Sequence, residues 1–571
     1  MLQFDKGIDK KDRIIAYYSM EIGLDSRIPT YSGGLGVLAG DTIRSCADLG
    51  VPIVGITLLS ERGYFYQKLD SDGNQIEMPV SWNKDNFLTL LPAKTTLHIE
   101  GRNVTVQVWQ YTVTGVGGAT VPVYLLDTNV EGNSEYDCAI TSYLYGGDLQ
   151  YRFAQEMVLG IAGVSILKEL GYTGIRKYHM NEGHAALLTL ELLERDKVDN
   201  NKPAYDPHNV RKMCVFTTHT PVPAGHDKFP HGIVRNMYGN ISRFEMDDEI
   251  HTDGMLNMTL LALRMSRFIN GVAKKHTEVS RSMFPGYSID SITNGVHSPT
   301  WVCESFAKLY DKYMPGWRTD PFTLRYALSI PNPEIWDAHM VAKKRLIDKV
   351  NSLTNAGMDH DILTIGFARR ATAYKRMELL FHDIENLVRI NDNAGEIQII
   401  FAGKAHPADL GGKETIRRIH TRIEELSGRI KIAYLPNYNM GLSRLMISGV
   451  DVWLNTPQRP MEASGTSGMK ACHNGVLNLS VFDGWWLEGY IKDATGWGIG
   501  LKPTDAKEEI KTDNAADASD LYNKLEHEIL PMFYDDKPKW MDMVCHSIAL
   551  NASFFNTHRM IQQYITSAYC H

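Results

Sequence analysis

The chain has 571 residues, of which 43% are hydrophobic, 22% charged and 10% aromatic, the balance of an ordinary globular protein. This length is sufficient for two large domains or for three to four smaller ones. The 59 basic and 67 acidic residues give a net charge of −8, which excludes a global electrostatic attraction to nucleic acid or to anionic lipid.

Cysteine usage and the N-terminus narrow the class of protein further. The seven cysteines are scattered and form no CxxC pair, which argues against a disulfide scaffold and a zinc ribbon. HExxH is absent and the histidines lie in separate segments, so no metal site is expected. The polar N-terminus has no signal-peptide core, and the longest apolar runs are far shorter than the ~20 residues that span a bilayer. We expect a soluble cytoplasmic protein.

The first half of the chain shows strand patterns and one long helix. Leu149–Leu170 is predicted to be helical, with Asp148 as its N-cap and Gly171 just beyond its end. Tyr64–Glu77 has hairpin character around the turn signal SDGNQ, and a helix is expected from about Leu38. The predicted strands are Arg13–Ser19, Val51–Leu59, Val104–Val113, Val121–Thr128, Lys177–Met180 and Met213–Thr218.

The second half alternates apolar strands with helices, a pattern typical of parallel βαβ units covered on both faces. The predicted strands are Ile362–Ala368, Ile397–Ala402, Ile430–Leu435, Val450–Leu454 and Val476–Phe482. The predicted helices are Arg376 to about Asn391, Glu414–Leu426, Leu442–Ser448 and Gly465–His473, and the stretch from Asp520 onward is also expected to be helical.

These patterns predict an α/β protein with two doubly wound, Rossmann-like domains. The proline-marked stretch at 300–335 is a plausible boundary, which gives an N-terminal domain of residues 1–315 and a C-terminal domain of residues 316–571. The last helices are expected to pack back on the N-terminal domain. Two such domains facing each other place the carboxyl ends of both sheets on one cleft, where ligands bind.

Two glycine-rich segments are candidate anion sites. Ser32–Gly36 precedes a helix, where backbone N–H groups and the helix dipole favour an anion, although a packing turn is an equal alternative. Glu462–Lys470 follows a predicted strand and also enters a helix. Its Lys470 could be an ordinary surface lysine, or it could form a Schiff base.

A basic segment lies at the end of a buried strand. Arg369, Arg370, Lys375 and Arg376 fall within eight residues, where an α/β sheet presents its ligands. A solvated basic loop is the alternative, but the position favours an anion site. Arginine suits bidentate phosphate recognition, and lysine acts as a point charge.

Three further segments follow apolar runs and carry neutral polar side chains: Asn181–His184, Thr218–Pro221 and Thr293–His297. Such groups suit sugar hydroxyls, although a lone loop histidine is more often structural. No GxSxG elbow is present, so a serine-triad hydrolase has little support.

Taken together, these segments resemble the α-glucan (glycogen, starch, maltodextrin) phosphorylase family, in its short bacterial or archaeal branch. Order and spacing agree over most of the chain, and the segment ending at Lys470 is highly specific. The segments that carry the resemblance are 18–22 (YSMEI), 33–36 (GGLG), 178–184 (YHMNEGH), 270–276 (NGVAKKH), 293–295 (TNG), 374–376 (YKR), 437–438 (NY) and 462–470 (EASGTSGMK).

The resemblance implies the GT-B arrangement of two facing Rossmann-like domains. The implied reaction is the reversible phosphorolysis of a terminal α-1,4-linked glucose by orthophosphate, which releases α-glucose 1-phosphate with retained configuration. The implied cofactor is pyridoxal 5′-phosphate, whose phosphate, rather than its ring, takes part in proton transfer. The implied partners are the glucan, orthophosphate and glucose 1-phosphate, with no nucleic acid, no membrane and possibly a second copy of the chain.

The resemblance also assigns roles to residues. Lys470 is implied to carry the cofactor, and Arg370 and Lys375 to bind the substrate phosphate, with His219 also among the catalytic residues. The implied cofactor contacts are Arg369, Tyr438, Thr466 and Gly34; the implied substrate contacts are Gly34, Leu35, Glu462, Ser464, Gly465, Asn294, His219 and the acid–histidine pair Glu182 and His184.

Departures from the longer family members set limits on these expectations. Arg369 stands where they have lysine and Thr372 where they have histidine, and an N-terminal regulatory extension is not expected.

The alternative function is a nucleotide-sugar-dependent glucan synthase of the same fold. Such enzymes often carry a second glutamate eight positions after the first, where this chain has Lys470 after Glu462. A non-catalytic glucan-binding relative would lack the phosphate cations or the lysine, and both are present.

Overall fold

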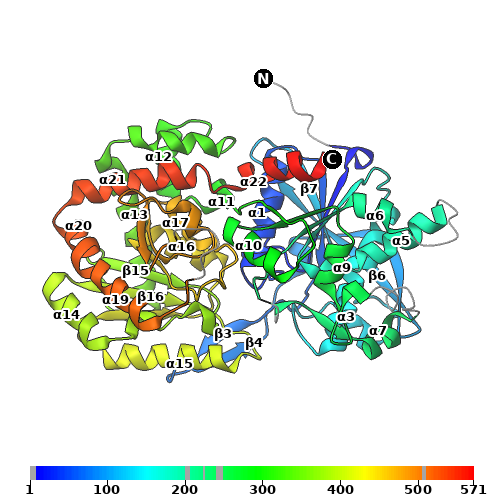
Figure 1. Ribbon diagram of the computed structural model, residues 1–571, viewed down its shortest axis with the longest axis horizontal. Helices are drawn as coiled ribbons and strands as arrows, with labels where there is room; N and C mark the ends of the chain where they lie inside the picture. Colours follow the sequence, from blue (N-terminus) through cyan, green and yellow to red (C-terminus); the bar gives the residue numbers. More distant parts are fainter. Residues whose placement is uncertain (1–7, 200–205, 223–224, 240–247, 504–509, 571) are drawn as a thin grey trace.

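The first half of the chain builds a nine-stranded sheet. The computed structural model describes residues 8–199, 206–222, 225–239, 248–503 and 510–570 (Figure 1). The strand order is β14-β13-β9-β8-β1-β2-β7-β6-β5, parallel from β14 to β7 and antiparallel at β6 and β5. The strands are β1 (Ile15–Ser19), β2 (Ile53–Leu58), β5 (Thr89–Ile99), β6 (Arg102–Thr114), β7 (Thr120–Asp127), β8 (Lys177–Asn181), β9 (Cys214–Thr217), β13 (Phe268–Gly271) and β14 (Asp290–Ser291).

Helices cover this sheet, so every residue of β1 and β2 is buried. Burial on both faces explains why these strands are apolar without alternation. Up to residue 313, the helices among the described residues are α1 (Gly34–Asp48), α2 (Glu135–Cys138), α3 (Leu149–Met157), α4 (Gly163–Glu169), α5 (Leu188–Asp199), α6 (Pro207–Met213), α7 (His231–Tyr238), α9 (Met258–Arg264), α10 (Lys274–Met283), α11 (Ser298–Trp301) and α12 (Glu304–Tyr313).

The second half builds a six-stranded parallel sheet in the order β17-β16-β15-β18-β19-β20. Its strands are β15 (Leu363–Ala368), β16 (Ile397–Ala402), β17 (Lys431–Leu435), β18 (Val452–Asn455), β19 (Leu477–Val481) and β20 (Gly496–Ile499). Its helices, with those that follow, are α13 (Asn332–Thr354), α14 (Ile384–Ala394), α15 (Leu410–Glu425), α16 (Met440–Gly449), α17 (Ser467–Cys472), α18 (Trp486–Gly489), α19 (Asn514–Lys524), α20 (Leu530–Tyr534), α21 (Lys537–Ser547) and α22 (Thr557–Tyr564).

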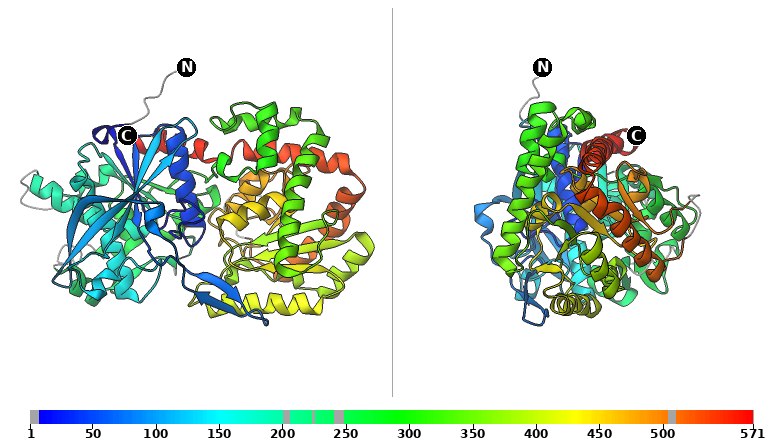
Figure 2. Two further views of the ribbon diagram at one scale, coloured as in Figure 1. Left: turned by 180° about the vertical axis from the view of Figure 1, so that it is seen from behind. Right: turned by 90° about the vertical axis from the view of Figure 1, so that its left-hand side faces the viewer.

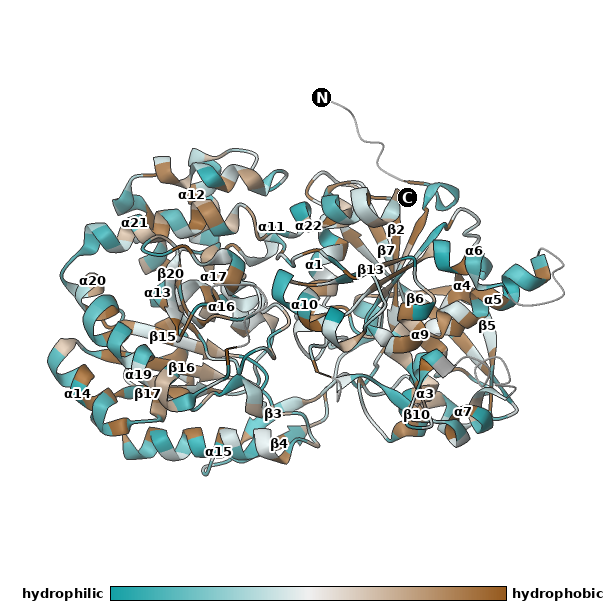
Figure 3. Ribbon diagram, viewed as in Figure 1, coloured by the Kyte–Doolittle hydropathy of each residue, from teal (hydrophilic) through white to brown (hydrophobic). Residues whose placement is uncertain are grey.

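Hydropathy follows this layering. Figure 3 shows hydrophobic residues concentrated on the strands of both sheets, whereas the outer helices mix hydrophilic and hydrophobic residues. Burial of one helix face explains that mixture. None of the described helices combines the length and the apolar character needed to cross a lipid bilayer.

A hairpin from the first half contacts the second half. Its strands, β3 (Tyr66–Leu69) and β4 (Gln75–Met78), pair antiparallel and extend toward α15 (Figure 2). Gln67 donates to the carbonyl of Gly403 (2.9 Å) and Gln75 to that of Ala405 (2.9 Å). A small sheet of β10 (Lys228–Pro230), β12 (Met255–Asn257) and β11 (His251–Thr252) completes the strands.

The C-terminal segment returns to the first half. Helix α22 lies beside α1 in Figure 1, and the hydroxyls of Ser45 and Thr557 lie 2.5 Å apart. Met560, Ile561 and Tyr564 are buried in the same apolar cluster as Ile15 and the inner face of α1. These contacts connect the C-terminal segment to the first half of the chain.

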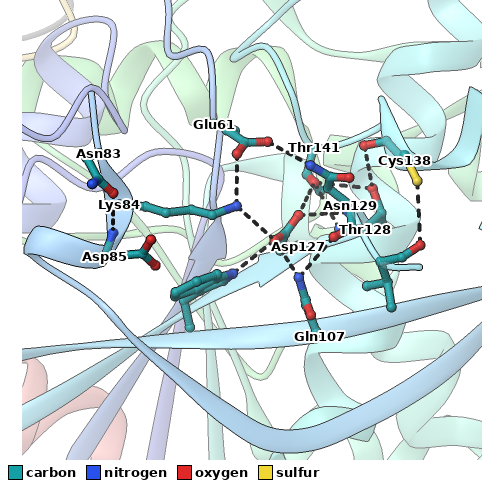
Figure 4. Close-up of polar contacts among 12 residues, drawn as sticks. Glu61, Asn83, Lys84, Asp85, Gln107, Asp127, Thr128, Asn129, Cys138 and Thr141 are labelled. Atoms are coloured by element: carbon teal, nitrogen blue, oxygen red, sulfur yellow. Dashed lines mark hydrogen bonds and ion pairs between the residues drawn. The ribbon is translucent and has the colours of Figure 1, made fainter. Parts of the chain in front are cut away.

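A buried carboxylate stabilises the end of β7. Asp127 Oδ2 accepts hydrogen bonds from Gln107 and Trp109, both 2.9 Å, and lies 3.7 Å from Lys84 Nζ (Figure 4). Lys84 also contacts Glu61 at 2.8 Å. The network joins β6, β7 and the loop that carries Lys84.

Several element boundaries differ from the sequence predictions. Leu149–Leu170 is interrupted by a π-helical turn at Val158–Ala162, although Asp148 does cap it by accepting from Tyr151 N (2.9 Å). The predicted helix start at Arg376 is wrong: Arg376 has φ +48°, and α14 begins at Ile384 after the N-cap Asp383. Helix α15 begins at Leu410, four residues before the predicted Glu414. The sequence predictions omitted β5, β13, β14, β20 and α13.

Candidate functional site

The predicted site segments follow strands of both sheets. Ser32–Gly36 lies after β1, and Asn181–His184 and His219 lie after β8 and β9. In the second sheet, Arg369–Arg376 follows β15 and Glu462–Lys470 follows β18. Each segment therefore lies beyond the carboxyl end of a parallel strand, where α/β sheets bind ligands.

Lys470 is a buried lysine on α17. Its Nζ lies 3.9 Å from the centre of the Trp301 ring and has no hydrogen-bond or ion-pair partner among the described residues. Burial lowers the pKa of this amine to about 8. Trp301 Nε1 in turn donates to Asp41 Oδ2 on α1 (2.7 Å). The neutral amine is the form that attacks an aldehyde, and a pKa of about 8 leaves a fraction of Lys470 neutral near pH 7.

Glu462 binds two cations of the basic segment. One oxygen, Oε2, lies 2.5 Å from both Arg369 Nη2 and Lys375 Nζ. Burial opposes ionisation of Glu462, but these two charges outweigh it and lower the carboxyl pKa to about 2. The neighbouring Asp483 accepts from Glu462 N (2.9 Å), and burial raises its pKa to about 7.

The basic segment divides into two parts. Arg370 is exposed and makes no contact with Glu462. Arg376 lies away from Glu462 and forms a buried ion pair with Asp517 (2.8 Å). Only Arg369 and Lys375 of the four clustered cations contact Glu462. Arg376 therefore has a structural role that the sequence pattern did not distinguish.

The glycine-rich loop is held by a carboxylate that the sequence reasoning did not single out. Glu21 Oε2 accepts from the backbone N–H groups of Ser32 (2.5 Å) and Gly33 (3.2 Å), and Oε1 accepts from Tyr145 Oη (3.1 Å). Gly33 is the N-cap of α1 and Gly34 its first residue, followed by Leu35. The space in front of Gly34 is open, since an added Cβ would meet no atom within 4 Å.

A second polar group lies at β8 and β9. Glu182, at φ +77°, accepts from His219 N (2.8 Å) and from Thr220 Oγ1 (2.9 Å). His219 Nε2 lies 2.7 Å from Asn181 Oδ1, and burial lowers its pKa to about 3, so the ring is neutral near pH 7. His184 contacts Asp227 (3.2 Å) rather than Glu182. A strained backbone at a buried acid is a feature of functional sites.

Several of the other predicted site residues have polar side-chain atoms that could bind a ligand. Asn294 Oδ1, Ser464 Oγ and Arg369 Nη1 are buried and have no hydrogen-bond partner among the described residues. Gly465 has φ +76°, and Thr466 precedes α17 as its N-cap. Tyr438 donates to Ser443 Oγ (2.9 Å), and burial raises its pKa to about 12.

A separate groove of about 1250 Å³ lies between α12, α13 and α16. Val341, Arg345 and Arg444 line it, but none of the predicted site residues does. Groove size alone therefore does not indicate the residues that carry the chemistry.

The chain is similar to a known protein family and to several named relatives. The model of the carbohydrate phosphorylase family matches residues 236–497. The maltodextrin phosphorylase of Thermococcus litoralis is 39% identical, over 99% of this chain and 72% of its own length. The glycogen phosphorylase of Aquifex aeolicus is 36% identical, over 100% and 88%, and an uncharacterized protein of Methanocaldococcus jannaschii is 32% identical, over 97% and 99%. The chain therefore belongs to the carbohydrate phosphorylase family.

Proposed function

We propose that the protein catalyses the reversible phosphorolysis of terminal α-1,4-linked glucose in maltodextrin, glycogen or starch, giving α-glucose 1-phosphate with retained configuration. The observation that carries this proposal is that one segment after β18 holds both Lys470 and Glu462. Lys470 is buried and without a hydrogen-bond or ion-pair partner among the described residues, and Glu462 binds Arg369 and Lys375. The names of the relatives favour phosphorolysis over nucleotide-sugar-dependent synthesis.

We further propose a GT-B arrangement, with an N-terminal domain at 1–315 and a C-terminal domain at 316–571. In it the carboxyl ends of the two sheets border one substrate cleft. The two parallel sheets, one in each half of the chain, support this division.

The residues present fit pyridoxal 5′-phosphate. Lys470 offers an amine with a pKa of about 8, as covalent attachment to an aldehyde requires. Arg369 Nη1 and the N-terminus of α17 offer donors for a phosphate. When bound, the group would supply a phosphate that exchanges protons with the substrate phosphate. Tyr438 and Thr466 complete the proposed surroundings.

The cations of this chain would make close approach of two phosphates possible. Like charges in a site of low dielectric repel strongly unless opposite charges compensate them. Arg369, Arg370 and Lys375 supply positive charge, and Gly34 supplies a backbone donor at the N-terminus of α1. Phosphate binding at Arg369 and Lys375 would compete with Glu462, which then becomes available to sugar hydroxyls.

Neutral groups would position the glucose ring. His219 is uncharged near pH 7, so it can exchange hydrogen bonds with hydroxyls without an electrostatic cost. Asn294 Oδ1, an acceptor, and Ser464 Oγ, a donor or acceptor, have no hydrogen-bond partner among the described residues. The proposed substrate contacts also include Gly465, Leu35, Glu182 and His184. Such positioning lowers the barrier to glucosyl transfer by holding the reacting atoms in alignment.

The activity test measures glucose 1-phosphate formed from maltodextrin and orthophosphate, with glycogen and short maltooligosaccharides compared. Lys470→Ala should lose nearly all activity. Formation of glucan only from a nucleotide sugar would contradict the proposal.

The attachment test uses two other lysines of the chain as internal controls. Burial lowers the pKa of Lys404 and Lys537 to about 8 as well, so amine reactivity alone does not distinguish them from Lys470. After borohydride reduction of the cofactor-loaded enzyme, peptide mapping should place the pyridoxyl group on Lys470. Labelling of Lys404 or Lys537 instead would show that the assignment is wrong.

A further inference from the structure

Three side chains of metal-ligating type meet where three segments of the chain converge. Asp48 is the last residue of α1, His297 precedes α11, and His558 lies on α22. Asp48 Oδ2 lies 2.7 Å from His297 Nε2 and 2.8 Å from His558 Nε2. All three side chains are at most 6% exposed, and their ligand atoms lie within 4.8 Å of one another.

The far side of each imidazole ring can take the proton that Nε2 would give up on binding a metal. His297 Nδ1 lies 2.7 Å from the hydroxyl of Thr300, which can either donate or accept. His558 Nδ1 has no partner among the described residues. Each ring can therefore carry its proton on Nδ1 and present a bare Nε2 without losing a hydrogen bond at Nδ1. Asp48 Oδ1 accepts from Val116 N (2.7 Å), which fixes the carboxylate.

Binding an ion would replace the two hydrogen bonds at Asp48 Oδ2. Metals bind a deprotonated carboxylate, and they bind a neutral imidazole through a nitrogen that carries no proton.

We propose that Asp48, His297 and His558 form a binding site for a divalent transition metal, with Zn²⁺ the best match. Two nitrogens and one carboxylate oxygen suit zinc, whereas Ca²⁺ and Mg²⁺ require oxygen ligands. Zinc bonds of ~2.0–2.2 Å in a tetrahedral site separate ligand atoms by roughly 3.3 Å. The two oxygen–nitrogen distances would therefore lengthen by about 0.5 Å around the ion. Water would take the fourth position.

The position of the site gives it a structural consequence. Because its ligands come from α1, the start of α11 and α22, an ion would connect the C-terminal segment to the first half of the chain. Helix α11 ends at Trp301, whose ring contacts Lys470. The metal would thus fix one end of the helix whose other end contacts the proposed cofactor lysine. The site does not depend on the proposed reaction.

A second cluster serves as the control. Asp359, His360 and Asp361 are consecutive, and their side chains are 49–80% exposed. Exposed side chains like these are hydrated and are not held in place by packing around a metal, so we expect no stoichiometric metal binding at this cluster. His360→Asn is therefore the matched variant for His558→Asn.

The test measures metal content in the full chain. The protein is stripped with a chelator, loaded with Zn²⁺ or Co²⁺, dialysed and analysed by elemental mass spectrometry. Wild type and His360→Asn should hold one ion per chain, whereas His558→Asn and Asp48→Asn should hold less than a tenth of that. Bound Co²⁺ should show the intense visible bands of a tetrahedral site. Zn²⁺ should raise the melting temperature of wild type and of His360→Asn, but not of His558→Asn or Asp48→Asn.

Circular dichroism of both variants checks that a lost ion does not reflect an unfolded chain. Asp48→Asn keeps the size of the side chain, so it tests the site even where His558→Asn is unstable. Two results would overturn the proposal: wild type that retains no ion after loading, or folded His558→Asn and Asp48→Asn variants that each retain one.

Discussion

The Arg369–Glu462–Lys375 cluster stabilises the folded chain, and its two cations are also proposed to bind phosphate. Replacing Glu462 by glutamine should separate these two roles. The carboxylate lies 2.5 Å from both cations and is nearly buried. Glutamine keeps the size of the side chain but removes the charge that compensates Arg369 and Lys375. We expect lower stability of the protein and, at the same time, tighter binding of inorganic phosphate.

The pKa of Glu462 sets the size of both effects. A fall in carboxyl pKa from 4.5 to about 2 corresponds to about 3 kcal/mol of favourable interaction with the ionised form. The free energy of unfolding should therefore fall by about 3 kcal/mol near neutral pH. Because phosphate no longer competes with the carboxylate, its dissociation constant should fall by up to about 100-fold.

The pH dependence gives the sign of the effect. The pKa of Glu462 is lowered in the folded state, so its stabilisation is complete above the unfolded value of 4.5 and is lost as the pH falls toward 2. The difference in stability between wild type and Glu462→Gln should be full at pH 6 and shrink below pH 4.5.

Urea unfolding and calorimetric titration with phosphate measure the two quantities. Glu414→Gln is the control, because Glu414 also pairs with two arginines, Arg417 and Arg418, but is exposed. That variant should change neither quantity measurably. Weaker phosphate binding by Glu462→Gln than by wild type would refute the proposal that phosphate competes with Glu462 for Arg369 and Lys375.

Three further changes test other parts of the structure. Arg370→Ala should weaken phosphate use, measured as a higher KM for phosphate, with the melting temperature unchanged. Arg376→Ala should destabilise the chain in urea unfolding, but by less than the ~3–5 kcal/mol of an uncompensated buried charge, because Arg459 still pairs with Asp517 at 2.8 Å. Asp127→Ala removes the acceptor of two buried hydrogen bonds and should cost at least about 3 kcal/mol in the same measurement. Because burial lowers the pKa of Lys470 to about 8, its reductive labelling by pyridoxal phosphate should rise with pH through about 8; a midpoint near 10.5 would contradict the burial of this amine.

The fold was predictable wherever a strand is buried on both faces. Ile397–Ala402 was predicted with its observed bounds because all six residues are apolar or packed in the sheet centre. Strand β20 was missed because Gly496–Ile499 has only four residues, two of them glycine. Helix α13 was missed because Pro331 and Pro333 suggested a boundary, whereas prolines at this position begin a helix.

Sequence patterns could predict only those parts of the candidate site that lie within one short segment of the chain. Polar segments that follow apolar strands identified Arg369, Lys375, Glu462 and Lys470. Their partners from distant parts of the chain leave no local trace: Asp227 beside His184 is one example. Glu21 could have been found, since it lies within the YSMEI segment, directly after β1.

The β3–β4 hairpin and helix α22 together constrain how the two halves of the chain can move. Gln67 and Gln75 attach the hairpin to the second half, and α22 attaches the C-terminal segment to the first. Figure 1 shows these attachments at opposite edges of the boundary between the two sheets. Two separated attachments leave one motion of low energetic cost, a rotation of one half of the chain relative to the other about the line through the hairpin and α22. In such a rotation, residues near the two attachments would move little, and residues farthest from that line would move the most.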